Sequence, residues 1–185
     1  MLCNGRAAWV GNSVRLLILF VIFFFSYPAN AYASSIAGRY VYSGQRVEDE
    51  ARIRQAIDIS VKPMNALLRP IARMKLTRRN VVISELELRD QNGNMFVRMD
   101  KKEATMPNNG VQGDYIATDG TPVKLSHRVS QDVWTQVYRG DGGTQTHVFT
   151  RQPDGILRME VSVESKRLAI PLRYVLRFVP SVQSI

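Results

Sequence analysis

Cysteine is almost absent from this sequence, since Cys3 is the only one among 185 residues. Cys3 precedes the apolar run from Leu16 to Phe25, and the rest of the chain after that run has no cysteine. A disulfide framework and a thiolate metal site are therefore excluded for residues 34–185. Packing alone must stabilise that part of the chain.

Long hydrophobic runs are missing as well. The run from Leu16 to Phe25 has ten apolar residues, whereas a membrane-spanning helix needs about 20. Basic residues precede this run, and the small-residue sites Ala29-Asn30-Ala31 and Ala31-Tyr32-Ala33 follow it. This order predicts a secretory signal peptide over residues 1–33, cleaved after Ala33. We therefore expect an exported protein, in the periplasm or outside the cell, with no nucleic-acid partner.

Motifs for catalysis are also absent. The sequence has no Gly-x-Ser-x-Gly elbow, no His-Glu-x-x-His motif and no Gly-rich phosphate loop. Its two histidines are His127 and His147, whereas a zinc site usually needs three or four protein ligands. We expect no metal and no cofactor, and nothing in the sequence requires an enzyme. A hydrolase or isomerase that uses one of the histidines remains a third hypothesis.

Acidic residues are fewer than basic ones: the chain has 16 Asp and Glu and 25 Lys and Arg, which gives a formal net charge of +9. Residues 59–84 contain six basic residues and no acidic one. A basic surface favours anionic partners such as lipid headgroups, polyanionic sugars or acidic proteins. Arg69 and Arg73 are the candidates for contact with an anionic headgroup. Peripheral contact with an anionic membrane surface is a further hypothesis.

Helical periodicity occurs over residues 46–78. Apolar residues recur here at three- and four-residue steps, so they share one face: Ile53, Ile57, Val61, Met64, Leu68 and Ile71. Pro63 and Pro70 each remove a backbone donor inside this stretch. The sequence therefore predicts an amphipathic helix that is either kinked or split into two near residue 62.

Strand signals fill most of the remaining sequence. Asn-Gly and Asp-Gly dipeptides mark tight turns, and from Asn109 onwards they recur at about ten-residue steps. The predicted strands are residues 38–43, 81–83, 95–99, 115–118, 123–129, 133–138, 144–150, 156–163 and 172–178. Polar and apolar residues alternate in the later strands, so one face of the sheet is apolar and must be covered. Consecutive hairpins favour an antiparallel up-and-down barrel of about 8–9 strands, with the first and last strands joined.

A resemblance supports this architecture. Gly38-Arg39-Tyr40 resembles the Gly-x-Trp opening of the lipocalins, with Tyr in place of Trp, and residues 148–157 are similar to a late hairpin of small bacterial lipocalin-like domains. A helix directly after the first strand resembles the fatty-acid-binding proteins, whose helical pair covers the barrel. The resemblance implies an α+β, mainly β, calycin barrel over residues 34–185. In the fatty-acid-binding proteins Arg and Tyr stand two residues apart to hold a carboxylate, whereas Arg173 and Tyr174 are adjacent here.

Aromatic residues in the first, middle and last strands suggest where a ligand would bind, because rings with polar tips can hold and orient an apolar molecule. The candidate ligand-binding residues are Tyr40, His127, Trp134, Tyr138, His147 and Tyr174. The leading hypothesis is a monomeric, non-enzymatic carrier with a small apolar or amphipathic ligand inside the barrel. The alternative is a cell-envelope interaction module, in which the barrel is filled and the basic helix binds a protein or a polyanion.

Overall fold

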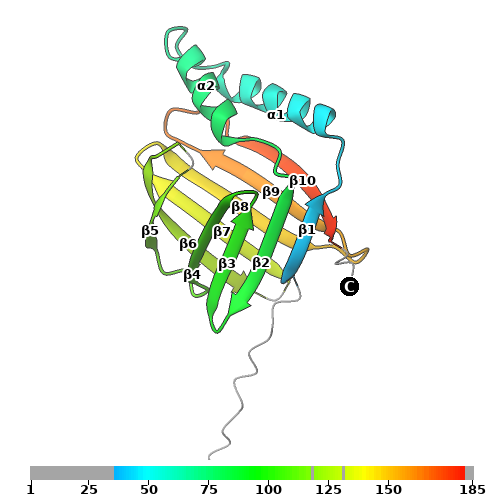
Figure 1. Ribbon diagram of the computed structural model, residues 1–185. Coiled ribbons are helices and arrows are strands. Elements are labelled where there is room, and N and C mark those ends of the chain that lie inside the picture. The colour runs from blue at the N-terminus through cyan, green and yellow to red at the C-terminus, as the bar shows by residue number, and fades with distance from the viewer. Residues whose placement is uncertain (1–35, 118, 131, 182–185) are drawn as a thin grey trace, which may run out of the picture. The chain divides into compact units, whose positions relative to one another are not determined.

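The computed structural model describes residues 36–117, 119–130 and 132–181. The predicted signal peptide, residues 1–33, lies outside these described residues. The described part consists of strands and two helices (Figure 1). In chain order they are β1 (Gly38–Tyr42), α1 (Arg46–Val61), α2 (Arg69–Arg79), β2 (Glu85–Gln91), β3 (Asn94–Met99), β4 (Lys102–Pro107), β5 (Gly113–Ile116), β6 (Pro122–Ser130), β7 (Val133–Gly140), β8 (Gly143–Arg151), β9 (Leu157–Glu164) and β10 (Leu172–Pro180).

The strands form one ten-stranded antiparallel sheet in the order β4-β3-β2-β1-β10-β9-β8-β7-β6-β5. The first and last strands are joined, as predicted, since Tyr42 lies opposite Phe178. The segment between β4 and β5 brings the two sheet edges together, because Asn109 forms a bridge with Arg128 of β6. The Gly110 amide also donates to the His127 carbonyl at 2.8 Å. The result is a nearly closed up-and-down barrel, the fold class that the sequence predicted.

The sheet has ten strands rather than eight or nine, and the difference lies near β2 and β4. Residues 81–83 are not a strand, although their apolar character predicted one. The strand begins at Glu85 instead, and its outward-facing Glu87 is paired with three arginines, Arg39, Arg89 and Arg98, at 2.7–3.2 Å. Those arginines cover the carboxylate, so a charged residue is buried on the outer face. A prediction based on apolar residues therefore missed β2, because a buried Glu87 depends on arginines of neighbouring strands.

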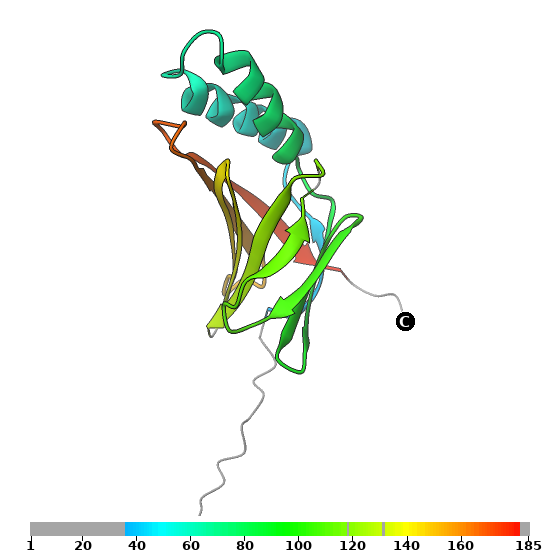
Figure 2. The ribbon, with the colours of Figure 1, turned by 90° about the vertical axis from the view of Figure 1, so that its left-hand side faces the viewer.

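The helical stretch is split, which was one of the two predicted outcomes. Pro63 lies in the connection between the helices, and Pro70 lies in the first turn of α2, where its missing amide hydrogen breaks no helical bond. Figure 2 shows both helices over one end of the barrel. Ile53 and Ile57 of α1 are buried in the core, whereas α2 has no buried residue. In the described part of the chain, neither helix combines the length and the apolar character needed to cross a membrane.

Two turns show why glycine stands where it does. Asn92 and Gly93 join β2 to β3 with φ values of 54° and 84°, the positive pair that a tight hairpin requires. Gly143 begins β8 with a φ of 135°, and a Cβ there would lie 2.1 Å from the Glu164 carbonyl oxygen. Glycine therefore lets β8 and β9 approach closely at the end of the barrel.

The barrel interior is packed unevenly along its axis. The turn between β5 and β6 lies at the helix end, because Arg79 of α2 pairs there with Asp119. Away from that end, the largest inward-facing side chains are almost completely buried, including Trp134 and Phe149. Toward the helices, several inward-facing side chains keep accessible surface beside the buried Leu125 and Leu172. They are Val123, Tyr138, Gln145, Val163 and Tyr174.

Candidate functional site

Three neighbouring strands place polar side chains side by side inside the barrel. His127 of β6 lies opposite Gln136 of β7, and Gln136 lies opposite His147 of β8. Strand alternation directs all three inward, where their exposed fractions are 0%, 0% and 5%. Gln145, two residues before His147, faces the same side of β8. We refer to His127, Gln136, His147 and Gln145 as the polar row.

A continuous chain of hydrogen bonds runs along the polar row. His127 Nδ1 lies 3.1 Å from the Met95 carbonyl oxygen, and His127 Nε2 lies 3.0 Å from Gln136 Nε2. Gln136 Oε1 lies 3.2 Å from His147 Nδ1, and His147 Nε2 lies 2.9 Å from Gln145 Nε2. These four contacts connect β3, β6, β7 and β8 through side chains.

The Met95 carbonyl fixes the direction of this chain, because a carbonyl oxygen can only accept a hydrogen bond. His127 therefore donates from Nδ1 and accepts at Nε2 from the Gln136 amide. Gln136 Oε1 then accepts from His147 Nδ1, and His147 Nε2 accepts from the Gln145 amide. Both imidazoles are assigned as neutral Nδ1–H tautomers by this reasoning. Every donor in the row points from Gln145 toward Met95.

Burial keeps both imidazoles uncharged. Desolvation lowers the pKa of His127 to about 4, although its hydrogen bond to the Met95 carbonyl acts in the opposite direction. Desolvation also lowers the pKa of His147 to about 3. Near neutral pH the polar row is therefore made of neutral groups only. In the described residues, no cluster of three or more His, Cys, Asp or Glu side chains is arranged to hold a metal ion.

Aromatic rings surround the polar row. The Trp134 ring lies edge-on to His127 with centroids 5.8 Å apart, and Phe149 lies 6.3 Å from His147. On the side toward the helices, the Tyr138 ring centroid is 5.3 Å from that of His147. Burial raises the pKa of Tyr138 far above 10, so its hydroxyl stays protonated. The Trp134 indole N–H is buried and has no hydrogen-bond partner among the described residues.

Four of the six residues predicted to bind a ligand lie together in the structure. They are His127, Trp134, Tyr138 and His147. Tyr174 faces the same interior, and its hydroxyl donates to Asn80 Oδ1 at 3.2 Å, which ties β10 to the segment after α2. Tyr40 is buried in the same hydrophobic core as Trp134, and its hydroxyl donates to the Ile36 carbonyl at 2.8 Å.

The sequence analysis missed Gln136 and Gln145 as functional candidates. Glutamine alone carries no signal of a site, and both residues were hidden among the polar positions of two strands. The available clue was strand register, since the turns on either side of β7 place Gln136 opposite both histidines. An inward-facing amide between two inward-facing imidazoles predicts a hydrogen-bonded chain.

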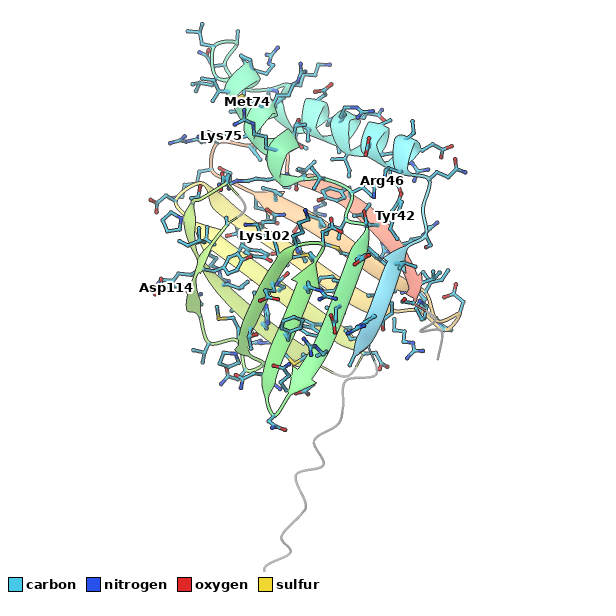
Figure 3. The ribbon with its side chains drawn as sticks, viewed as in Figure 1. Tyr42, Arg46, Met74, Lys75, Lys102 and Asp114 are labelled. Atoms are coloured by element: carbon cyan, nitrogen blue, oxygen red, sulfur yellow. The ribbon has the colours of Figure 1, made fainter. Side chains whose placement is uncertain are left out.

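The two arginines proposed for an anionic headgroup already have partners in the structure. Arg73 Nε lies 2.7 Å from Asp58 Oδ1, which joins α2 to α1. Arg69 Nη2 donates to the Met64 carbonyl at 3.1 Å. Figure 3 shows Met74 and Lys75 on α2, and Lys102 at the start of β4. The helix surface thus combines basic residues with exposed apolar ones, Leu67, Leu68, Ile71 and Met74.

Two surface clefts border the helices. One has a volume of about 200 Å³ and is lined by residues of α1, the end of α2 and the following segment, including Ile53, Ile57 and Asn80. The other has a volume of about 280 Å³ and lies beside Asp49, Arg52 and Arg177. Neither cleft is lined by the polar row. Both are below the size of about 300 Å³ at which small-molecule sites usually begin.

Solved structures with a similar fold exist, although no protein-family profile and no curated protein sequence matches this chain. The wild-type fluorescent protein UnaG is 13% identical with a TM-score of 0.53, over 79% of this chain and 97% of that one. The REP1-NXSQ fatty acid transporter is 11% identical with a TM-score of 0.48, over 78% and 95%. A Schistosoma mansoni fatty acid binding protein in complex with arachidonic acid is 15% identical with a TM-score of 0.47, over 80% and 97%. At such identities the likeness concerns the fold alone, and it rests on UnaG, whose TM-score exceeds 0.5.

The neutral histidines predict how stability depends on pH. Below about pH 6.5 the histidines of the unfolded chain take up protons, while those of the folded barrel do not until about pH 4 for His127 and about pH 3 for His147. The free energy of unfolding should therefore fall as pH drops through this window. The loss should reach at most about 1.4 kcal/mol per pH unit for each histidine. Urea unfolding of residues 34–185 at several pH values measures it.

A His147→Gln variant serves as the control, because its amide can replace hydrogen bonds but cannot titrate. The decrease in unfolding free energy between pH 6.5 and pH 4 should be smaller in this variant than in the parent. Carboxylates contribute equally to both proteins and cancel in the comparison. Equal slopes for the two proteins would show that His147 is not held neutral by the fold.

Proposed function

We propose that the mature protein is a non-enzymatic carrier that holds a small apolar or amphipathic molecule inside the helix end of its barrel. The observation that carries this proposal is the uneven packing of the interior. Trp134 and Phe149 are completely buried, whereas inward-facing Tyr138 and Val163 keep accessible surface. A barrel packed tightly up to the helices that cover it would leave these side chains as buried as Trp134.

The chemistry of this helix-end interior suits an amphipathic ligand. Val123 and Val163 offer apolar surface to a ligand. Each Å² of apolar surface that binding removes from water contributes roughly 25 cal/mol. The Tyr138 ring and the Gln145 amide add polar atoms beside them. A site of this kind is mostly apolar with a few polar groups that fix orientation.

The helices supply the cover of the proposed site. Arg79 at the end of α2 pairs with Asp119 and donates to Thr121 Oγ1 at 2.8 Å, so α2 is tied to the turn between β5 and β6. Asn80 holds the Tyr174 hydroxyl on the opposite part of the rim. These polar contacts are few, and α2 has no fully buried residue, although Ala72 and Leu76 pack partly buried against the core. Ligand entry under α2 therefore requires breaking only a small number of partly exposed contacts.

Export is part of the proposal and rests on the basic flank, the short apolar run and the small residues that end at Ala33. A tagged full-length chain expressed in a bacterial host should yield a shortened product in the periplasmic or extracellular fraction. N-terminal sequencing of that product should begin at Ser34. An intact N-terminus in the membrane fraction would contradict a cleaved signal.

The exposed surface of α2 favours a second candidate function. Leu67 and Leu68 directly before α2 are 82% and 53% exposed, and the exposed Ile71 and Met74 lie on α2 with Lys75 and Arg78. An apolar and basic surface can bind an anionic membrane surface or an acidic protein. In that case the protein would be an envelope interaction module, and its barrel interior would not need to accept a ligand.

Filling the helix-end interior separates these two functions. A Val163→Trp variant should abolish or weaken by at least tenfold the binding of Nile red, because the large ring would occupy the accessible space opposite Gln145. Ser162→Trp is the matched control, since Ser162 is the next residue and faces outward. Fluorescence titration of both variants and the parent, with circular dichroism to check folding, gives the comparison.

The outcome distinguishes a site inside the barrel from one on its surface. Loss of binding in Val163→Trp alone supports the carrier. Equal binding by the parent and both variants would place the dye on the outer surface and favour the interaction module. Absence of any dye binding to the parent would remove the support for a carrier.

A further inference from the structure

The polar row ends at Gln145, whose inward-facing side chain keeps accessible surface at the helix end of the barrel. Gln145 donates a hydrogen bond from Nε2 to His147. The Oε1 atom of the Gln145 amide is then left to accept a hydrogen bond from another group. Gln145 Oε1 has no hydrogen-bond partner within the described part of the chain. The hydroxyl of Tyr138, the inward-facing residue two positions after Gln136 on β7, also has no hydrogen-bond partner among the described residues. Gln145 lies directly opposite Tyr138 in the register of β7 and β8.

The direction of the polar row strengthens that acceptor. All of its hydrogen bonds donate the same way, from Gln145 through His147 and Gln136 to His127, and the last proton goes to the Met95 carbonyl. In such a chain each bond polarises the next one. An amide that donates its N–H becomes a better acceptor at its oxygen. Gln145 Oε1 is therefore suited to a partner that brings a hydrogen-bond donor.

Positive charge is missing from the middle of the interior. Among the described strand residues, charged side chains at inward-facing positions occur only at strand ends. They are Asp90, Lys102 and Arg151. Arg173 faces outward and is exposed, beside inward-facing Tyr174. Lys102 begins β4 at the helix end and is exposed, whereas the inward-facing residues of β7 and β9 beside Gln145 carry no positive charge. A carboxylate placed beside Gln145 would therefore lose its hydration with no cation on the adjoining strands, which is costly.

We infer that the ligand carries an uncharged head that donates a hydrogen bond, such as a primary amide or a hydroxyl, and that Gln145 Oε1 and the Tyr138 hydroxyl receive it. The apolar remainder of the ligand lies against Val123 and Val163 at the helix end. This inference rests on the proposed carrier function and adds to it the chemical class of the ligand. A fatty acid, whose carboxylate is an acceptor only, is the wrong class for this site.

Four probes with the same apolar chain test the inference. Oleamide and oleyl alcohol carry donors, methyl oleate is neutral without a donor, and oleate is an anion without a donor. Displacement of Nile red from residues 34–185 near neutral pH measures their affinities. Oleamide and oleyl alcohol should bind at least tenfold more tightly than methyl oleate and oleate.

Two variants assign the effect to the named atoms. Gln145→Met keeps the length of the side chain and removes the acceptor, so oleamide affinity should fall at least tenfold while oleate affinity stays unchanged. Tyr138→Phe removes only a hydroxyl and should reduce oleamide affinity severalfold, which provides a test if Gln145→Met does not fold. Thr146→Val is the matched control, because Thr146 is the neighbour of Gln145 on the outer face.

The results separate this inference from the carrier function on which it rests. Equal or tighter binding of oleate or methyl oleate would overturn the inference and leave the carrier intact. Donor selectivity that survives both Gln145→Met and Tyr138→Phe would overturn the assignment to these residues. Failure of Nile red and all four probes to bind would overturn the carrier function and the inference together.

Discussion

The interior of this barrel depends on the Met95 carbonyl, which accepts the last proton of the polar row. Because that oxygen cannot donate, it fixes the tautomer of His127, then the orientation of Gln136, the tautomer of His147 and the orientation of Gln145. Protonation of either imidazole at Nε2 would place its new N–H donor against the N–H donor of a glutamine amide. The low pKa of both histidines and the hydrogen-bond pattern thus have the same cause, which is burial of a fully paired neutral chain.

Barrel closure holds the polar row in register. The Gly110 amide binds the His127 carbonyl, so the segment that joins the sheet edges also anchors the strand that carries the first histidine. A one-residue slip between β6, β7 and β8 would turn the row outward. Filled packing around Trp134 lies on one side of the row, and accessible surface at Tyr138 lies on the other. The row therefore forms the boundary between the closely packed half of the barrel and the half proposed to hold a ligand.

Local signals in the sequence predicted most of the fold but only part of the site. Turn dipeptides and alternation predicted the strands from β6 to β10, since both signals depend on neighbouring residues. The joining of the first and last strands was predicted because the apolar face of the sheet must be covered. The strand β2 was missed because Glu87 on its outer face is buried by arginines from three strands. Gln136 was missed because its role comes from register with His127 and His147. Arg69 and Arg73 were chosen for their charge, but their partners Met64 and Asp58 become visible only in three dimensions.

The most direct test of this account is the tautomer and protonation state of the two imidazoles. Nitrogen-15 NMR of the histidine rings in residues 34–185, followed over pH, reports both. We predict that His127 and His147 are neutral Nδ1–H tautomers near neutral pH and begin to titrate only near about pH 4 and about pH 3. An Nε2–H tautomer in either ring, or titration of either histidine near pH 6.5, would contradict the account.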